Sequence, residues 1–307
     1  MSQPRAVAII NPATGHRAAQ ALVAEVRAVT TTQDITLFAR LTERPGHAVE
    51  LARACARDAS MLLAIGGDGT VSDVITGALD TDTPIGIIPA GSTNMVAKDL
   101  GIPQRTRAAT LVALQGCTVG VDIAKAGTTT FVHMAGAGYD AEIMRRATTT
   151  WKRRIGWLAY VLPAISQARY PAFHARIVVD GIEHRLRARM ILLALGAGII
   201  APRFHVGAGI NRSDGQIDIC IFNPPGLLTM LGTLGWIAVG KPERSRWQHQ
   251  LRGQRIELDA DRRVPFEVDG DYLQDLPVTV ELLATRARIL IPRDAHGMCP
   301  PSSAREA

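Results

Sequence analysis

The first hundred residues repeat one arrangement three times: a short apolar run, a polar loop that contains glycine, and a segment with helical periodicity. The apolar runs span residues 6–10, 61–65 and 85–88, and the loops that follow them span residues 11–15, 66–70 and 89–94. Buried strands that alternate with helices are typical of a parallel sheet covered on both faces. Because the carboxyl ends of parallel strands meet at one edge, the sequence predicts that the three loops converge where open α/β sheets bind ligands.

The middle loop, Gly66-Gly67-Asp68-Gly69-Thr70, has the composition of a phosphate-binding turn. Glycines let the backbone approach a phosphate closely, and the helix expected from about Val71 offers N–H groups and a positive dipole end. A carboxylate such as Asp68 is repelled by phosphates unless it binds a metal or accepts a proton. Taken alone, the loop is equally compatible with a tight turn in which Asp68 caps the helix. Its two companion loops favour the phosphate site.

The companion loops carry polar residues that could also serve the backbone. Asn11, Ser92 and Asn94 each precede a predicted helix, and their side chains are typical helix caps. We keep capping as a concurrent role for these three residues.

After about residue 120 the pattern changes to short β-like runs separated by Asp-Gly turns. The runs are residues 131–135, 175–180, 190–195, 217–222, 255–258, 264–268 and 278–282. They predict an antiparallel sandwich or barrel. Two helical stretches, residues 154–168 and 226–240, interrupt it, and we expect the second of these to be core rather than a membrane anchor.

Composition restricts the class of protein. The net charge of +6 favours anionic partners, but basicity is the only indication of nucleic acid, which we do not predict. Four cysteines without a CxxC pair argue against a disulfide framework or a zinc site. The start lacks a signal-peptide pattern, and none of the four lysines lies in a Gly-Lys-Ser/Thr loop, which argues against a P-loop NTPase. We expect a cytoplasmic protein whose contact with the inner face of the membrane, if any, is peripheral.

Three segments of the first half, IINPATG, LLAIGGDGTVSDVITGAL and IGIIPAGSTNMVAKDLGIP, resemble the diacylglycerol kinase catalytic family in order and spacing. That family includes bacterial lipid kinases and the diacylglycerol, sphingosine and ceramide kinases. VDIAKAG, FVHMAGAGYDAEI, SDGQIDICIF and FEVDGDYL resemble its later landmarks, so the similarity runs from residue 5 to about residue 290. The resemblance implies an ATP-binding α/β domain of Rossmann-like, NAD-kinase-like type at residues 1–124 and a lipid-binding β-sandwich at residues 125–290. It also implies that the tail, residues 291–307, returns to the first domain.

The resemblance also implies which residues hold ATP. Thr42 matches a family threonine that contacts the nucleotide, and Ser92 stands where the family usually has threonine. Asp68 would help to organise Mg²⁺ and the phosphates. The implied ATP-binding set is Asn11, Pro12, Ala13, Thr14, Gly15, Thr42, Gly66, Gly67, Asp68, Gly69, Thr70, Val71, Ser72 and Ser92.

The catalytic base implied by the resemblance is the last residue of an Asp-Gly-Glu motif. Here the motif reads Asp269-Gly270-Asp271, so the carboxylate is kept on an arm that is one methylene shorter. A general base must come within about 3 Å of the hydroxyl that it deprotonates. We expect Asp271 to serve as this base, with Asp68 as the second candidate, while a plain hairpin turn remains the alternative for the motif.

The segment 211–216 is the metal site that the resemblance implies. Bacterial members bind a structural Mg²⁺ there through an aspartate and backbone carbonyls, which match Asp214 and the carbonyls of Asn211 and Gln216. One carboxylate with carbonyls and water suits Mg²⁺. An Asp-Gly turn without metal is the equal alternative.

A basic cluster surrounds Trp151 and suits an anionic lipid surface, where cations meet headgroups and indoles lie at the interface. A solvated helix end is the equal alternative for it. The cluster consists of Arg145, Arg146, Lys152, Arg153 and Arg154.

Together these features predict an ATP- and Mg²⁺-dependent lipid kinase with a diacylglycerol-type acceptor; the sequence also allows a homodimer. One alternative is a kinase with a soluble acceptor such as NAD, because NAD kinases share the GGDGT element. The other is a non-catalytic nucleotide-binding protein, which the change from glutamate to Asp271 suggests.

Overall fold

The computed structural model describes residues 4–13, 17–146, 170–198 and 204–293. The chain forms two compact units. One contains the chain up to Val121 and again from Thr285, and the other spans Asp122–Ala284.

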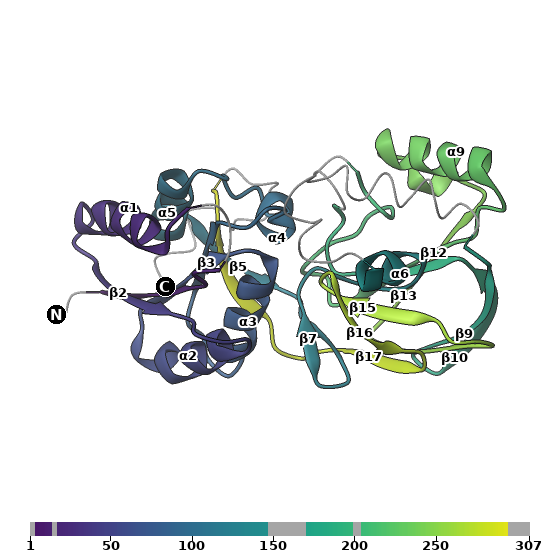
Figure 1. Cartoon of the computed structure of the whole chain (residues 1–307), viewed down its shortest axis with the longest axis horizontal. Coiled ribbons are helices and arrows are strands. Elements are labelled where there is room, and N and C mark those ends of the chain that lie inside the picture. The colour runs from purple at the N-terminus through teal and green to yellow at the C-terminus, as the bar shows by residue number, and fades with distance from the viewer. Residues whose placement is uncertain (1–3, 14–16, 147–169, 199–203, 294–307) are drawn as a thin grey trace, which may run out of the picture. The chain divides into compact units, whose positions relative to one another are not determined.

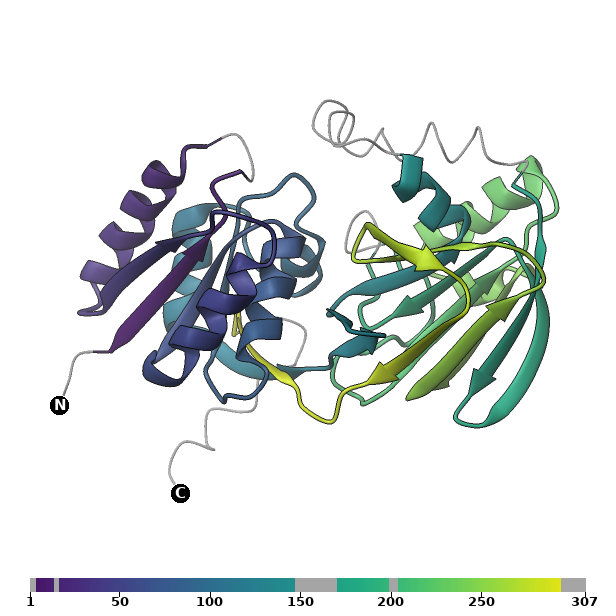
Figure 2. The same ribbon diagram turned by 60° about the horizontal axis from the view of Figure 1, so that its bottom comes forward.

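The first unit is built on a six-stranded sheet with the strand order β2-β1-β3-β4-β18-β5. All neighbouring strands are parallel except β5, which pairs antiparallel with β18. Figure 2 shows the yellow C-terminal strand β18 returning to this unit. The strands are β1 (Arg5–Ile10), β2 (Thr36–Leu41), β3 (Met61–Gly66), β4 (Ile85–Pro89), β5 (Cys117–Val121) and β18 (Ala287–Ile291).

Helices cover both faces of this sheet, with α1 and α5 on one side and α2 and α3 on the other (Figure 1). This cover explains why β1, β3 and β4 are buried on both faces and carry continuous apolar runs. Gly77 allows α2 and α3 to pack closely, since a Cβ there would lie 2.3 Å from the carbonyl oxygen of Val49. The helices are α1 (Ala19–Thr31), α2 (His47–Cys55), η1 (Ala56–Asp58), α3 (Asp68–Ala78), α4 (Met95–Asp99) and α5 (Thr106–Gln115).

The second unit contains two six-stranded sheets, with the orders β10-β9-β14-β17-β6-β7 and β13-β12-β11-β8-β15-β16, in which all pairs are antiparallel. Its strands are β6 (Ala124–Ala126), β7 (Thr129–Phe131), β8 (Met134–Gly138), β9 (Phe173–Val179), β10 (Ile182–Ala188), β11 (Met190–Ala194), β12 (Ile217–Phe222), β13 (Gln248–Gly253), β14 (Arg255–Ala260), β15 (Pro265–Val268), β16 (Asp271–Asp275) and β17 (Val278–Leu282). Its helices are α6 (Tyr139–Arg146), α9 (Leu227–Ala238) and η2 (Pro242–Arg244).

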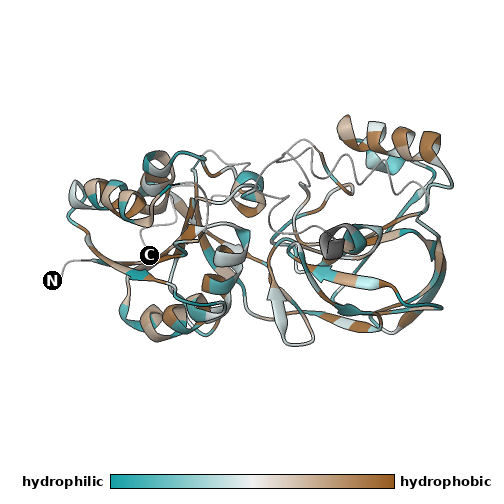
Figure 3. Cartoon of the chain, in the orientation of Figure 1, coloured by the Kyte–Doolittle hydropathy of each residue, from teal (hydrophilic) through white to brown (hydrophobic). Residues whose placement is uncertain are grey.

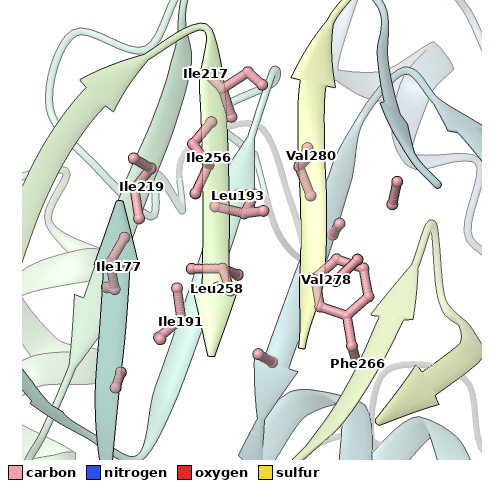
Figure 4. Packing of buried hydrophobic residues seen from close by; sticks show 14 of the residues in the cluster. Ile177, Ile191, Leu193, Ile217, Ile219, Ile256, Leu258, Phe266, Val278 and Val280 are labelled. Carbon is pink, nitrogen blue, oxygen red and sulfur yellow. The ribbon is translucent and has the colours of Figure 1, made fainter. Parts of the chain in front are cut away.

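Alternating side chains of the two sheets form the core of this unit (Figure 4). In β11, Ile191 and Leu193 enter the core between the sheets, whereas Leu192 and Ala194 belong to a second cluster on the opposite face. Ile237 of α9 packs in that second cluster. Both faces of the β12–β11–β8 sheet are therefore covered, and its strands are as apolar as those of a parallel sheet.

The predicted fold class, a parallel α/β domain followed by a β-sandwich, is confirmed. Some local predictions are wrong. The run 131–135 is not one strand, because the chain is interrupted between β7 and β8 where the N–H groups of Val132 and Met134 bind Asp269. Cys117 is disulfide-bonded although the sequence predicted no disulfide framework, whereas Cys55 and Cys220 are free. The predicted helix at residues 154–168 lies outside the described residues.

Candidate functional site

Polar loops follow four neighbouring strands at the carboxyl edge of the first sheet. Backbone hydrogen bonds align them: the N–H of Asn11 donates to the carbonyl of Ile65 (3.3 Å), and that of Thr42 donates to the carbonyl of Ile10 (2.8 Å). The N–H of Ala90 donates to the carbonyl of Gly66 (2.9 Å). The three loops predicted to converge therefore share this edge, together with Thr42 after β2.

The turn between β3 and α3 leaves room above the first turn of the helix. Helix α3 begins at Asp68, three residues earlier than predicted, with Gly67 in extended conformation as its N-cap. The first N–H groups of a helix lack partners within the helix and attract anions. Apart from its chain neighbours and the backbone of its own helix, a Cβ at Gly69 would meet no atom within 4 Å. Glycine inside a helix costs about 1 kcal/mol relative to alanine. Packing does not explain this glycine, whereas an approaching phosphate would.

Asp68 joins two of the loops. One carboxylate oxygen accepts the backbone N–H of Val96 (3.0 Å), and the other accepts the hydroxyl of Thr93 (3.1 Å). Asp68 thereby caps the first turn of α4, a role for the side chain that depends on tertiary contacts. An ionised carboxylate has about four acceptor sites, so these two bonds leave capacity for a hydrated cation.

The loop after β4 is shaped by Asn94, which has a positive φ of 50°. Its side chain does not cap α4; it bonds both backbone groups of Gly91 (2.9 Å each) and the side-chain oxygen of Gln104 (3.1 Å). Gly91 in turn lies against Gly67, because a Cβ at Gly91 would be 2.6 Å from the Gly67 Cα. Ser92 is exposed at the tip of this loop, so its hydroxyl is accessible.

The loop after β1 is only partly described. The side-chain oxygen of Asn11 accepts the N–H of Ala13 (3.0 Å), and Pro12 and Ala13 are exposed. Thr14 and Gly15 lie outside the described residues.

In the second unit, Asp269 and Gly270 form a two-residue hairpin turn between β15 and β16. Both have positive φ (46° and 91°), as the favoured type I′ turn requires. The carboxylate of Asp269 accepts the N–H groups of Met134 (3.1 Å) and Val132 (3.4 Å), which ties the turn to the start of β8. Asp271 follows as the first residue of β16 and is exposed. The predicted hairpin and an accessible carboxylate thus coexist.

A buried carboxyl pair that the sequence did not predict supports this turn. Glu267 of β15 is buried and accepts the N–H of Gly270 (2.6 Å). It is also hydrogen-bonded to Asp140 of α6, and burial together with the negative charge of Asp140 raises the pKa of Glu267 well above its ordinary value. Gly136 leaves the space for both groups: its Cβ would lie 2.9 Å from a Glu267 oxygen and 3.0 Å from an Asp140 oxygen.

The loop at residues 211–216 holds the predicted metal ligands. Asp214 accepts the N–H of Gln216 (3.1 Å), and Asp122 accepts the N–H of Gly215 (2.7 Å). Burial raises the pKa of Asp214, an effect partly offset by the Gln216 N–H and by Arg252, whose guanidinium is 4.0 Å away. Among the described residues no three His, Cys, Asp or Glu side chains cluster as metal ligands. A Mg²⁺ site made of one carboxylate and carbonyls needs no such cluster.

Two further predictions concern membranes. The basic cluster around Trp151 lies outside the described side chains. Within the part of the chain that the structure describes, no helix is long and apolar enough to cross a bilayer.

Residues 5–126 match the model of the diacylglycerol kinase catalytic domain, and residues 133–291 match that of the YegS C-terminal NAD kinase beta sandwich-like domain. A crystal structure of a diacylglycerol kinase from Bacillus anthracis superposes with a TM-score of 0.74 at 20% identity, covering 96% of this chain and 99% of that one. At that identity the likeness concerns the fold alone.

Curated relatives agree with these matches. A Staphylococcus carnosus protein named "Diacylglycerol kinase" is 24% identical over 94% of this chain and 96% of its own length. A "Probable lipid kinase YegS-like" from Chromohalobacter salexigens is 29% identical, covering 76% of this chain and 77% of the relative. An uncharacterized Synechocystis protein is 31% identical over 76% of this chain, which spans 55% of that relative. The chain belongs to the family of lipid kinases that join a diacylglycerol kinase catalytic domain to a YegS-type β-sandwich domain.

Proposed function

We propose that the protein is an ATP- and Mg²⁺-dependent kinase that phosphorylates a lipid hydroxyl, with diacylglycerol as the acceptor type. The observation that carries the proposal is the set of polar loops at the carboxyl edge of β2-β1-β3-β4. There Gly69 leaves open space over the first turn of α3. Family membership supports phosphoryl transfer from ATP, and the names of relatives support a lipid acceptor.

In this proposal the phosphates of ATP lie over the α3 N-terminus, and ATP supplies the transferred phosphoryl group. The first-turn N–H groups, from Gly67 to Thr70, would bind phosphate oxygens, and the exposed Ser92 hydroxyl would donate to another. Asp68 would hold the loops after β3 and β4 together by accepting hydrogen bonds from Thr93 and Val96. Its remaining lone pairs would orient water bound to Mg²⁺. The other family-implied residues, Asn11 to Gly15 and Thr42, would complete the nucleotide site.

The proton of the acceptor hydroxyl would pass to Asp271. Its carboxylate is exposed on a turn that Asp269 and Glu267 hold by hydrogen bonds, so its position is defined although its arm is short. Glu267 itself is a poor base here, because its raised pKa favours the protonated form. A second cation at Asp214 would be structural. The same proposal places the enzyme in the cytoplasm with its substrate in the inner face of the membrane.

The experiment is transfer of labelled phosphate from ATP to a panel of diacylglycerol, sphingosine, ceramide and phosphatidylglycerol, with NAD as a soluble acceptor. Label in diacylglycerol supports the proposal, and label in NAD alone would replace the lipid by a soluble acceptor. ATP binding without transfer to any acceptor would indicate a non-catalytic nucleotide-binding protein.

Asp68→Asn is the sharpest variant for this experiment. It removes the charge but keeps an oxygen that can accept the Val96 N–H, so we expect transfer to be lost while the unfolding temperature is nearly kept. Thr93→Val is the matched control, since it removes one structural hydrogen bond of Asp68 and leaves the carboxylate. Normal turnover of Asp68→Asn would show that the charge of this residue has no role in transfer.

A further inference from the structure

Helix α9 (Leu227–Ala238) exposes all four of its leucines to the solvent. Leu228 is 84% exposed, and Leu231 and Leu234 are 48% and 42% exposed. The helix contains no charged residue. In Figure 3 much of the α9 ribbon is brown, the colour of hydrophobic residues, and Figure 1 places the helix on the outside of its unit. The expectation that this stretch is core is therefore wrong.

The inner face of α9 is mixed, with Thr233 beside the apolar Met230, Leu234 and Ile237. Its buried residues are Thr233 and Ile237. The hydroxyl of Thr233 bonds the carbonyl of Thr229 (2.9 Å) and the hydroxyl of Ser245 (2.8 Å). A surface helix of a globular protein normally turns its apolar stripe inward and its polar side chains outward. Packing against the sandwich therefore does not account for the outer leucines.

The fit between α9 and the sheet is also loose. A partly open pocket of about 90 Å³ lies between the helix and the sheet, lined mainly by apolar side chains that include Met190, Phe222 and Leu234. Selection for stability of this unit would favour polar outer residues and a filled pocket. The apolar surface thus indicates contact with something other than water.

Basic residues follow the C-terminal end of the helix. Lys241, Arg244 and Arg246 lie within six residues, with Glu243 as the one acidic residue among them. Arg244 lies over the ring of Trp236 (5.6 Å to the centroid), and Arg246 lies over that of Trp247 (6.0 Å). Tryptophan and basic side chains beside an apolar surface match the layered chemistry of a bilayer, in which headgroups border hydrocarbon.

We propose that α9 is a membrane-docking helix that inserts its outer leucines into the surface of a bilayer with anionic headgroups. The helix is about 18 Å long, so it would lie in the interface and not cross the bilayer. The choice of a bilayer rests in part on the proposed lipid acceptor, whereas the exposure of the α9 leucines does not depend on it.

A second copy of the chain is a weaker occupant. The outer face of a helix of this length and about 10 Å in width could contribute on the order of 200 Å² of surface to an interface. A stable interface buries about 800 Å² on each partner. Shallow insertion into lipid has no such requirement, because the hydrocarbon surrounds each inserted side chain.

Vesicle sedimentation without ATP tests the proposal. The full chain is mixed with vesicles of phosphatidylcholine alone or with added phosphatidylglycerol, and the bound fraction is measured. We expect binding that anionic lipid strengthens. The double variant Leu228→Gln/Leu231→Gln should bind vesicles at least about tenfold more weakly than the parent protein. Full burial of a single leucine side chain already contributes a factor of about ten in affinity.

Matched controls separate this surface from general effects. Ile182→Gln replaces another exposed apolar residue, 66% exposed on β10, and should bind like the parent protein. Arg244→Gln should weaken binding to anionic vesicles about fivefold and leave binding to neutral vesicles unchanged, whereas Arg185→Gln on β10 should do neither. All four variants alter exposed side chains, so unchanged thermal unfolding is expected and would confirm that they fold.

Equal vesicle binding by the double variant and the parent protein would overturn the proposal, as would no binding by the parent. Loss of self-association in the double variant, with vesicle binding unchanged, would assign α9 to a second copy instead. A parallel assay with a short-chain, water-soluble acceptor separates the two proposals. Transfer without vesicle binding would refute the docking proposal and leave the kinase proposal standing. Vesicle binding without transfer to any acceptor would refute the kinase proposal and leave the docking proposal standing.

Discussion

Replacing Glu267 tests the buried carboxyl pair directly. Its side chain accepts the N–H of Gly270 at 2.6 Å and is hydrogen-bonded to Asp140. Gln and Leu are therefore the two most informative substitutions. Glu267→Gln keeps an oxygen for the Gly270 N–H and an N–H₂ group that can donate to Asp140. Glu267→Leu has a similar volume but leaves the Gly270 N–H without this acceptor. The bond is part-buried, so its loss costs about 0.5–1.5 kcal/mol of unfolding free energy.

The pH dependence has a definite sign. Burial first, then the charges of Asp140 and Asp269, raise the pKa of Glu267 in the folded state, against an ordinary value of about 4.3 in the unfolded chain. Above pH 4.3 the unfolded chain therefore binds fewer protons than the folded one. Stability therefore falls as pH rises from about 4.3 towards the folded-state pKa of Glu267. Below about pH 4.3 the carboxyl is protonated in both states, so this effect disappears.

Urea unfolding of the full chain between pH 5 and pH 9, on the parent protein and both variants, measures these effects. We expect Glu267→Gln to match the parent at low pH and to become relatively more stable as pH rises. Glu267→Leu should be less stable than Glu267→Gln by about 0.5–1.5 kcal/mol throughout. A stability difference between parent and Gln that does not change with pH would refute the argument for a raised pKa. Equal stability of Leu and Gln would refute the role of the Gly270 bond.

Four further predictions follow from the site and its surroundings. Asp271→Asn should reduce kcat by about 10²-fold or more, as expected for loss of a general base, whereas Asp271→Glu should keep or raise it in the lipid transfer assay. Gly69→Ala should stabilise the first unit by about 0.5–1 kcal/mol in thermal unfolding while raising the KM for ATP, because a methyl group occupies the space over α3. Mg²⁺ should raise the unfolding temperature of the parent protein and not of Asp214→Asn, a calorimetric test that is independent of activity. Cys220, whose pKa burial raises to about 12, should resist a thiol reagent at pH 8 until the protein unfolds, whereas Cys55 should react in the folded state.

The sequence predicts best where one pattern decides the outcome. β1, β3 and β4 are buried on both faces, so their apolar runs and the glycine loops after them are visible in the chain itself. Strands such as β2 and β10 were not predicted, because one face of each is exposed and carries polar or charged residues that mask the β pattern.

Contacts between distant segments could not be predicted in this way. The pairing of Glu267 with Asp140 needs α6 and β15 side by side. The hydrogen bond that the Val96 N–H donates to Asp68 joins two residues that lie 28 positions apart in the sequence. For α9 the difficulty is of another kind: an apolar helix has the same sequence pattern whether it is core or surface, and only its neighbours decide.

The position of β18 has a consequence for how the protein is made. This strand lies between β4 and β5, so an interior strand of the first sheet consists of residues 287–291. A growing chain emerges from the ribosome with its N-terminus first, and at that stage β4 has no neighbour on one side and β5 has no partner in the sheet. The first unit can therefore close its sheet only after the whole second unit has been synthesised, and a nascent chain that ends before Ala287 would expose an unpaired strand edge to chaperones and proteases.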